Sequence, residues 1–410
     1  MSVKGVNITK ASLKLSANLS KESTSGLIAN GLPISGKLAL DKNYTLFSKA
    51  DANALGLDAA YDTTNKVVLY HHISEAGEGT KLIIRVVAQT VSAVDMVDVA
   101  NTHAKKMIDD AEGEIFQLAV ALNPASGYTP VVNGIDQDIL DAIPKAQGLV
   151  DYAFSKMYPT RVILEGKYYA GPASSVPDLR SLVNVQAPNV SVCIGQDLNF
   201  ADSLAEFNGY AAVGTCLGTV ASAAVSENIG WVERFNLTDA KKSRWLAAGL
   251  SDNNSVMSVQ SDWQILSDKG YILPVKYARL DGFRWNNDHC CVSIMVDNDG
   301  NMNESQIRFG RTLDKAALNA YAALLPSVKS PQPVDTGTGK VPPVVITNFR
   351  TLAESGIDGN LTGELSGREV VISKDSNLLP PDPELLVGIS VVPIGSADKI
   401  SVRLKLSNNI

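Results

Sequence analysis

Cysteine and histidine are scarce in this chain, whose 410 residues include only 4 of each. Two cysteines, Cys290 and Cys291, are adjacent, and the other two, Cys193 and Cys216, stand apart from them. This number and spacing do not match the disulfide framework of a small secreted domain. The run starting at His289 is too tightly spaced for one tetrahedral zinc ion, and no Cys-x-x-Cys motif completes it. We therefore expect reduced, buried thiols, no metal and no cofactor.

Basic excess and long apolar runs are also missing. The chain has 43 acidic and 36 basic residues, a net charge of −7, which makes nucleic acid a poor candidate for a partner. Lys4 and Lys10 interrupt the start of the chain before a secretory leader could form, so we expect synthesis in the cytoplasm. Residues 115–135 contain too much Pro and Gly for a membrane helix, and residues 207–226 are mostly small. We expect a strand and loop, a buried helix, and no direct membrane insertion.

A large apolar fraction is present, because 45% of the residues are hydrophobic and only 19% are charged. With this length, the chain should form two or three compact units. Between residues 43 and 200, strand-like runs alternate with helical periodicity, which predicts an open, largely parallel α/β sheet. The expected strands are residues 81–87, 115–122, 160–165 and 189–194, and the expected helices are residues 94–111 and 139–157.

The second half of the chain has a mixed pattern. In a central region, 201–310, we expect helices over 203–226 and 239–250 and a hairpin of residues 291–296 and 305–309. In the last region, 311–410, apolar residues from Leu313 onward share one helical face, and the Pro-rich residues 326–343 predict an extended connector. The expected strands of this region are residues 344–348, 369–373, 385–394 and 400–406.

Both ends of the chain have the alternation of amphipathic strands. Residues 1–42 carry a net charge of +4, whereas residues 43–310 carry −11. Terminal strands of this kind either add to an exposed sheet edge of another copy or complete the sheet of their own domain, and the pattern alone leaves both open. The apolar positions are Ala11, Leu13, Leu15, Ala17 and Leu19 in the first strand, which ends before a turn at residues 23–26, and Ile400, Val402, Leu404 and Leu406 in the last.

Motifs for catalysis are incomplete. Asp335-Thr336-Gly337 resembles the aspartic protease triplet, but only one copy exists and it lies in the Pro-rich connector. Asp297 begins an alternation of oxygen-bearing side chains like that of a calcium loop, but Met302 and Arg308 occupy the positions that require Gly and an acid. No nucleophile elbow or dinucleotide-binding fingerprint is present. The sequence therefore nominates no catalytic residue.

A family resemblance begins at residues 307–313, Ile-Arg-Phe-Gly-Arg-Thr-Leu. This segment and the Ala/Leu-rich helix after it resemble the C-terminal domain of contractile tail sheath proteins of phages and phage-derived injection systems. The similarity continues through residues 361–367 and 387–394 to the last strand, 400–406. Residues 43–50 and 81–86 are similar to an earlier pattern of that family, in which a short strand and helix precede a strand with an Arg-Val pair.

The resemblance implies a structural subunit without enzymatic activity that polymerises helically around an inner tube and contracts to drive the tube through a target envelope. It implies an open α/β domain plus a C-terminal α+β core domain with extended terminal β-arms, divided into residues 1–42, 43–200, 201–310 and 311–410. The implied partners are other copies, the inner tube protein, and baseplate and terminator proteins, in a virion tail or injection particle assembled after synthesis in the bacterial cytoplasm. The implied intersubunit contacts are Ala11, Leu13, Lys14, Leu15, Ala17, Leu19, Ile400, Val402, Arg403, Leu404, Lys405 and Leu406.

Two alternatives remain open from the sequence. One is an α/β enzyme of unknown substrate, such as a hydrolase that uses Asp335 or the cluster at residues 297–303. The other is a tube or baseplate component, although tube subunits are usually much smaller.

Overall fold

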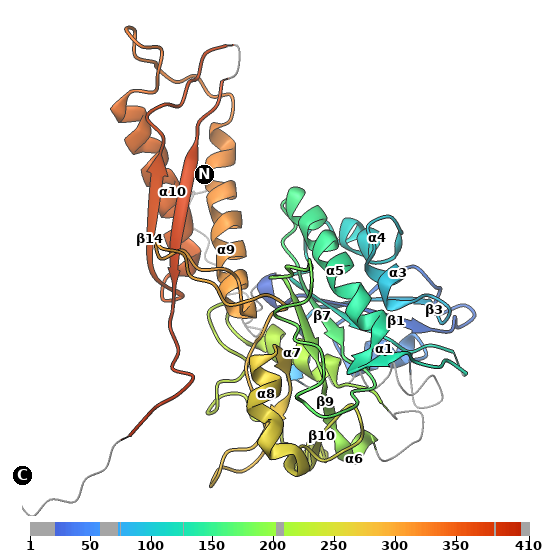
Figure 1. Ribbon diagram of the computed structural model, residues 1–410. Coiled ribbons are helices and arrows are strands. Elements are labelled where there is room, and N and C mark those ends of the chain that lie inside the picture. The colour runs from blue at the N-terminus through green and yellow to red at the C-terminus, as the bar shows by residue number, and fades with distance from the viewer. Residues whose placement is uncertain are drawn as a thin grey trace, which may run out of the picture.

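A seven-stranded sheet organises the larger of two lobes in the computed structural model, which describes residues 21–57, 73, 75–125, 127–201, 209–380 and 383–402 (Figure 1). The strand order is β11-β8-β7-β4-β1-β3-β2, and every pairing is parallel except that of β2 with β3. The strands are β1 (Ser25–Gly31), β2 (Asn43–Leu46), β3 (Leu82–Ala88), β4 (Gln117–Ala121), β7 (Arg161–Glu165), β8 (Val190–Cys193) and β11 (Tyr271–Ile272).

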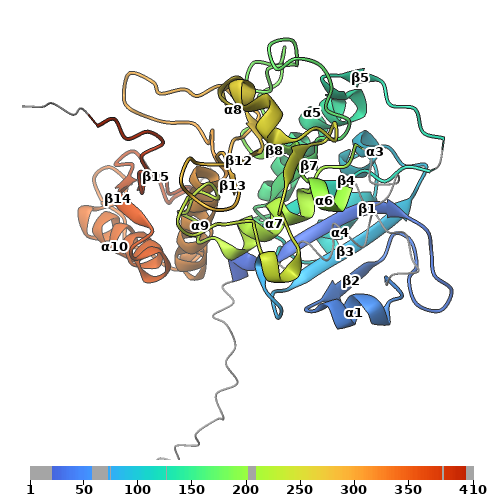
Figure 2. The same cartoon turned by 90° about the horizontal axis from the view of Figure 1, so that it is seen from below.

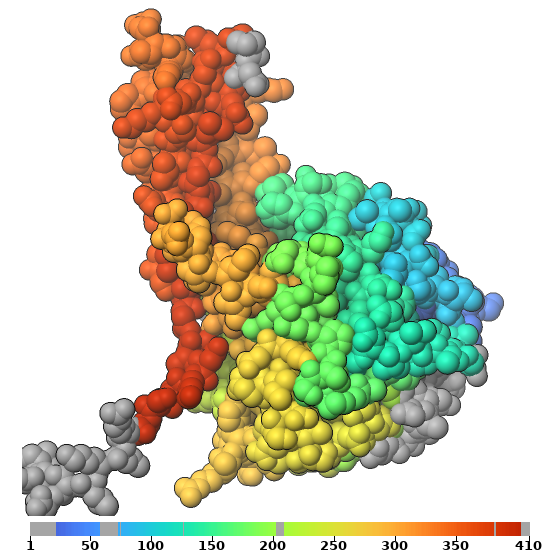
Figure 3. Space-filling view, viewed as in Figure 1, coloured from blue at the N-terminus to red at the C-terminus, as the bar shows by residue number. Residues whose placement is uncertain are grey.

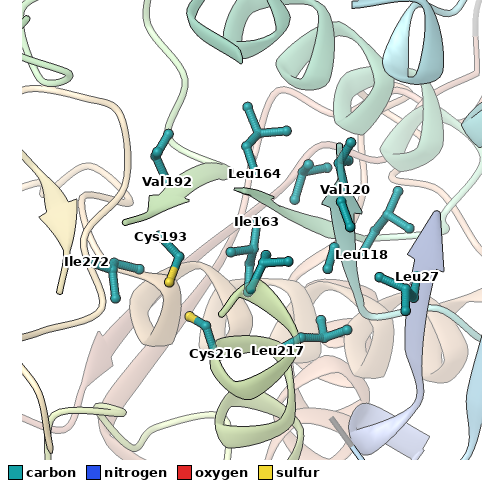
Figure 4. Close-up of a cluster of buried hydrophobic side chains, with 14 of the residues drawn as sticks. Leu27, Leu118, Val120, Ile163, Leu164, Val192, Cys193, Cys216, Leu217 and Ile272 are labelled. Atoms are coloured by element: carbon teal, nitrogen blue, oxygen red, sulfur yellow. The ribbon is translucent and has the colours of Figure 1, made fainter. Parts of the chain in front are cut away.

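Helices cover both faces of this sheet. On one face α5 (Gln137–Ser155) packs against β7 and β8, together with α3 (Ala93–Val97) and α4 (His103–Asp110). On the other face lies α7 (Val213–Ser222), whose Cys216 and Leu217 point toward Ile163 and Cys193 of the strands (Figure 4). Both faces of the sheet are therefore shielded from water. This explains why the strand sequences are continuous apolar runs and do not alternate between apolar and polar residues.

The remaining elements of the large lobe are short. They include two small antiparallel pairs beside the main sheet, β9 with β10 and β12 with β13, and a third pair, β5 with β6, before α5. Their bounds are η1 (Lys21–Ser23), α1 (Lys49–Ala54), β5 (Val132–Asn133), β6 (Ile135–Asp136), β9 (Gly195–Asp197), α6 (Leu198–Ala201), η3 (Ala240–Lys242), β10 (Ala248–Leu250), η4 (Val256–Asp262), α8 (Trp263–Asp268), β12 (Pro274–Val275) and β13 (Arg284–Trp285).

The small lobe contains two long helices and one hairpin, which stand beside the large lobe (Figures 1 and 2). They are α9 (Ile307–Leu324), α10 (Pro343–Leu361), β14 (Leu365–Ile372) and β15 (Val387–Pro393), with η5 (Leu325–Ser327) after α9. The lobe has its own apolar cluster, built around Ala320, Ala353, Ile357 and Ile372. No helix among the described residues is long and apolar enough to cross a membrane.

Most predicted elements of the α/β sheet are confirmed. The strands predicted at 81–87, 115–122, 160–165 and 189–194 are β3, β4, β7 and β8, and the helix predicted at 139–157 is α5. In the small lobe the helix after Arg311, the connector, and the strands at 369–373 and 385–394 are also found, although α9 already begins at Ile307. The buried helix predicted at 203–226 is shorter, at Val213–Ser222, and part of its predicted start lies outside the described residues.

Two helix predictions in the large lobe were wrong. The helix at 94–111 is interrupted, because Asp98 has extended backbone and Ser92 and Thr102 each begin a separate helix. The helix at 239–250 is only one 3-10 turn followed by β10. There Ser243 and Trp245 have positive φ, and the chain turns so that the Trp245 ring packs edge-to-face on Trp285.

Three strand or turn predictions were also wrong. The second strand of the hairpin, 305–309, does not form because Ile307 begins α9, although Val296 and Met302 form an antiparallel bridge across the predicted turn. Residues 344–348 lie in α10, which starts at Pro343, a favourable first helical position, and packs Ile346 against the small core. The turn at 23–26 overlaps β1, an interior strand of the main sheet. Of the strand at 400–406, residues 400–402 are not in a strand and the rest lies outside the described residues, as does the strand at 11–19.

Candidate functional site: the joint between the lobes and the open small sheet

The joint between the lobes is the first half of α9, where the segment that carries the family resemblance lies. Ile307, Arg308, Gly310, Arg311 and Thr312 are all buried, although three of them are charged or polar. The second half of the same helix contributes Ala316 and Ala320 to the small core. A single helix is therefore shared by two cores, and its polar residues must find partners in the large lobe.

Asp288 caps the start of this helix. Its backbone carbonyl accepts from the Ile307 N–H at 2.8 Å, and its carboxylate accepts from the Arg308 N–H and the Asn228 amide, each at 2.9 Å. A carboxylate here satisfies helix N–H groups that lack partners and lies at the positive end of the helix dipole. Complete burial nevertheless raises the pKa of Asp288 to about 7.

Arg161 of β7 binds the next turn of α9. Its guanidinium donates to Asp314 at 2.8 Å, to Glu304, and to the Pro188 carbonyl at 3.3 Å. The side chain is 2% exposed, so the two carboxylates compensate a charge that water cannot reach. Gly310 lies directly on the guanidinium, since a Cβ at this position would be 1.9 Å from its central carbon. Glycine is what allows the helix to approach the arginine.

Arg311 and Lys315 extend the joint on the other side of α9. The buried Arg311 guanidinium donates to the carbonyls of Ala223, Ala224 and Glu22 at 3.2 to 3.4 Å, and burial lowers its pKa to about 10. Lys315 binds Glu364 at 2.9 Å and lies 3.8 Å from Glu22. The joint thus connects the first described residues, the end of α7, and the turn that leads into β14.

The small sheet has two open edges. β14 and β15 pair only with each other among the described residues, over seven or eight positions. Val370 and Ile372 are buried, whereas Val387, Ile389 and Val391 on β15 are only half-buried. An isolated two-stranded sheet is marginal, and an open edge with partly covered apolar residues is a template for an additional strand.

A strap, which we define as residues 394–402, follows β15 along the outside of the large lobe (Figures 1 and 3). Two contacts hold it, from Arg308 to the Ser396 hydroxyl at 2.6 Å and from Asn287 to the Asp398 carboxylate at 3.5 Å. Beyond these contacts Ile400 is 81% exposed and Val402 is 75% exposed. The structure therefore places these two predicted contact residues on the surface.

The other predicted contact residues lie outside the described residues. They are Ala11, Leu13, Lys14, Leu15, Ala17, Leu19, Arg403, Leu404, Lys405 and Leu406.

The acids considered for catalysis both cap turns. The Asp335 carboxylate accepts from the Gly337 and Thr338 N–H groups and from the Thr338 hydroxyl, and these bonds lower its pKa. Asp297 accepts from the Asn301 side chain and from the Asp299 and Asn301 N–H groups, which likewise lowers its pKa. Ionised, fully exposed turn caps do not have the raised pKa of a shared-proton dyad.

A serine and a histidine lie within hydrogen-bond distance of each other in the large lobe, but the histidine is in the wrong tautomer for catalysis. His289 Nδ1 lies 2.6 Å from Arg180 and Nε2 lies 2.8 Å from the Ser267 hydroxyl. Arginine can only donate, so Nδ1 accepts and the ring proton is on Nε2, pointing at Ser267. Burial and the Arg180 charge lower the pKa of His289 to about 3. The ring therefore cannot accept the serine proton.

The carboxyl ends of the parallel strands, where α/β folds often bind ligands, are filled by the protein's own side chains. The Asn30 amide donates to the Ala88 and Val91 carbonyls and accepts from the Asn123 N–H. The buried Glu165 carboxylate accepts from the Leu122 and Ala211 N–H groups. These polar side chains therefore serve as hydrogen-bond partners of backbone N–H and carbonyl groups. Among the described residues no cluster of His, Cys, Asp or Glu could hold a metal ion.

Comparison with solved structures identifies similar folds over the whole chain. A chain of the anti-feeding prophage (AFP) helical sheath in the contracted state matches with a TM-score of 0.57 and 16% identity, over 100% of both chains. A chain of the AFP baseplate matches with a TM-score of 0.61 and 16% identity, over 99% of both chains. A chain of the PVC sheath complex, an extracellular contractile injection system in the contracted state, matches with a TM-score of 0.55 and 12% identity, over 100% of this chain and 98% of that chain.

Comparison with sequences gives a family. No curated protein matches this sequence. The model of the family described as DUF2586, N-terminal domain, matches residues 3–289, which is more than half of the chain. This chain therefore belongs to the DUF2586 family.

Proposed function

We propose that this protein is the sheath subunit of a contractile injection system or phage-tail-like particle, which polymerises helically around an inner tube. The observation that carries the proposal is the small sheet with two open edges in a chain whose ends are both amphipathic. The likeness over the whole chain to sheath structures supports it at the level of the fold. In this proposal the protein is not an enzyme, and its partners are other copies, the tube protein, and baseplate and terminator proteins.

The arms supply the strands that complete neighbouring sheets. In each arm alternate apolar residues, such as Leu13 and Leu15, cover the half-buried side of β15 in a neighbour, and the backbone satisfies its edge. Lys14, Arg403 and Lys405 face acidic surfaces, which fits a body of net charge −11 over residues 43–310. Since β1 belongs to the sheet, the arm within residues 1–42 ends before Ser25. The other proposed segments, 43–200, 201–310 and 311–410, do not fold separately, since β1 and β11 join the sheet of 43–200 and α9 begins at Ile307.

The joint gives this subunit the stiffness that contraction needs. When a lattice changes its packing, subunits rotate as rigid bodies about their contacts. Arg161 and Asp288 fix α9 to the large lobe, so a displacement of the small sheet also displaces the large lobe. Energy stored in the extended lattice is then released as motion, without a nucleotide.

Electron microscopy of the purified full-length protein tests the proposal. Tubes, rings or helical sheaths are expected, and deletion of residues 1–20 should leave soluble monomers. A sharper variant replaces Leu13 and Leu15 by Asp, which should abolish polymers, whereas replacing Ser12 and Ser16 by Asp on the opposite face should not. A monodisperse monomer that binds a small molecule stoichiometrically would instead favour an enzyme.

A baseplate component is the second candidate, because a chain of the AFP baseplate has a TM-score of 0.61. In that case the purified protein should form rings of fixed size at every concentration. Tubes whose length grows with protein concentration would favour a sheath, since only open helical contacts continue without limit.

A further inference from the structure

A cleft of about 1070 Å³ separates the strap from the large lobe. Figure 3 shows the hollow between the strap and the neighbouring surface of the large lobe. One wall is formed by large-lobe residues that include Trp231, Tyr277 and Leu280, and the other by the strap, including Ile394 and Ile400. This volume is large enough for several side chains, and it lies between two parts of the same chain.

The large-lobe wall carries apolar side chains that nothing in the described chain covers fully. Trp231 is 48% exposed, and Tyr277 and Leu280 are also exposed. On the strap, Ile400 and Val402 are even more exposed, so both walls present apolar surface to water. Bringing such surfaces together removes apolar area from water and is favourable.

The anchors of the strap act as a pivot. Ser396 and Asp398 bind Arg308 and Asn287 at the edge of the cleft, and Gly395 has no neighbouring atom within 4 Å of an added Cβ. Ile400 is two residues beyond the last anchor, roughly 7 Å of extended chain. A rotation of the backbone after Asp398 is enough to turn Ile400 toward the opposite wall, while both anchors stay in place.

We propose that, in the free protomer, this cleft binds the chain's own C-terminal segment, with Ile400 and Val402 against Trp231, Tyr277 and Leu280. The inference rests on the proposed function: the docked segment is withheld from neighbouring copies, and assembly requires its release. The short tether gives the segment a high effective concentration at its own cleft, so this docking occurs before contact with a second copy in dilute protein.

A disulfide test uses Leu280→Cys together with Ile400→Cys in the full-length protein. The four native cysteines are all buried, so the two new thiols are the accessible ones. Mild oxidation of dilute protein should cross-link the pair within one chain, and the cross-linked protomer should not polymerise until it is reduced. The matched control is Val183→Cys with Ile400→Cys, because Val183 is exposed and does not line the cleft.

A cross-link formed only between two chains, or no more often than in the control pair, would overturn the proposal. If the cross-link forms within the chain but the reduced protein never polymerises, the docking stands and the proposed function fails. The two failures are therefore distinguishable.

A kinetic test uses Trp231→Ala. If docking is favoured about tenfold over release, removing the docking surface should raise the initial rate of polymerisation about tenfold. Leu246→Ala is the control, since Leu246 is about as exposed but lies outside the cleft. An unchanged or slower rate in the Trp231 variant would contradict the proposal.

Discussion

Gly310 of α9 lies directly against the guanidinium group of Arg161 on β7, although the two residues are 149 positions apart in the sequence. A Cβ on Gly310 would be 1.9 Å from the carbon of that group. The contact places the helix that enters the small lobe close to the first residue of β7, an interior strand of the main sheet. It also makes the charge of Arg161 accessible to Asp314 on the following turn of the same helix.

Gly310→Ala should destabilise the protein, because the added methyl group must displace a buried charged group that has no free space around it. Overpacking of this kind costs about 1 to 3 kcal/mol, and separation of the ion pairs adds to it. Gly359→Ala in α10 is the control, since no atom lies within 4 Å of its added Cβ. That change should be neutral or stabilising by up to about 1 kcal/mol. Urea unfolding measures both, and equal effects would contradict the contact.

Asp314→Ala should lower the free energy of unfolding by about 3 kcal/mol, since it leaves the buried guanidinium of Arg161 with one carboxylate fewer. The double variant Arg161→Met with Asp314→Leu should recover part of this loss, because no uncompensated charge remains. Chemical denaturation of both variants tests the pair. A double variant that is less stable than Asp314→Ala alone would contradict this explanation by charge compensation.

The raised pKa of Asp288 predicts an unusual pH dependence of the free energy of unfolding. Its folded pKa, about 7, is above the usual value of an aspartate, so its contribution to stability is largest in acid and is lost as the pH rises through 7. Asp288→Asn removes this titration. The free energy of unfolding of the variant minus that of the wild type should therefore increase between pH 5 and pH 8.5. Thermal or urea unfolding at several pH values measures the difference, and a constant difference would be inconsistent with a titrating cap.

The lowered pKa of His289 predicts that stability changes with pH in the opposite direction. Its folded pKa is about 3, below the usual value near 6.5, so its contribution is present above pH 6.5 and is lost as the pH falls toward 3. His289→Gln should therefore reduce the loss of stability between pH 6.5 and pH 4, although the variant will be less stable at pH 8. A variant with the same acid sensitivity as the wild type would show that the ring is already charged in the folded protein.

The sequence allowed prediction of the elements whose signal is local. Strands β3, β4, β7 and β8 are buried apolar runs, and α5 and α9 repeat their apolar residues at helical spacing. Strand β1 was missed because its Ser, Gly, Ala and Asn residues have no preference for strands, and it forms by pairing with β3 and β4. Residues 344–348 are rich in β-branched residues, but they lie on α10, where Ile346 packs against the small core.

The joint could not be predicted as a site. Arg161 within an apolar strand was a visible signal, since an arginine at such a position requires compensation. Its partners Glu304 and Asp314 are more than 140 residues away, and one sequence does not show which acids meet it. The capping role of Asp288 could not be predicted for the same reason, because the helix that it caps begins 19 residues later in the chain.

The sharing of α9 by two cores has a mechanical consequence. A torque applied to the small hairpin is carried along one uninterrupted helix into the seven-stranded sheet, so the protomer transmits it with little bending. In the lattice proposed above, the motion between copies is then taken up outside the two cores, because the joint leaves little bending within one protomer.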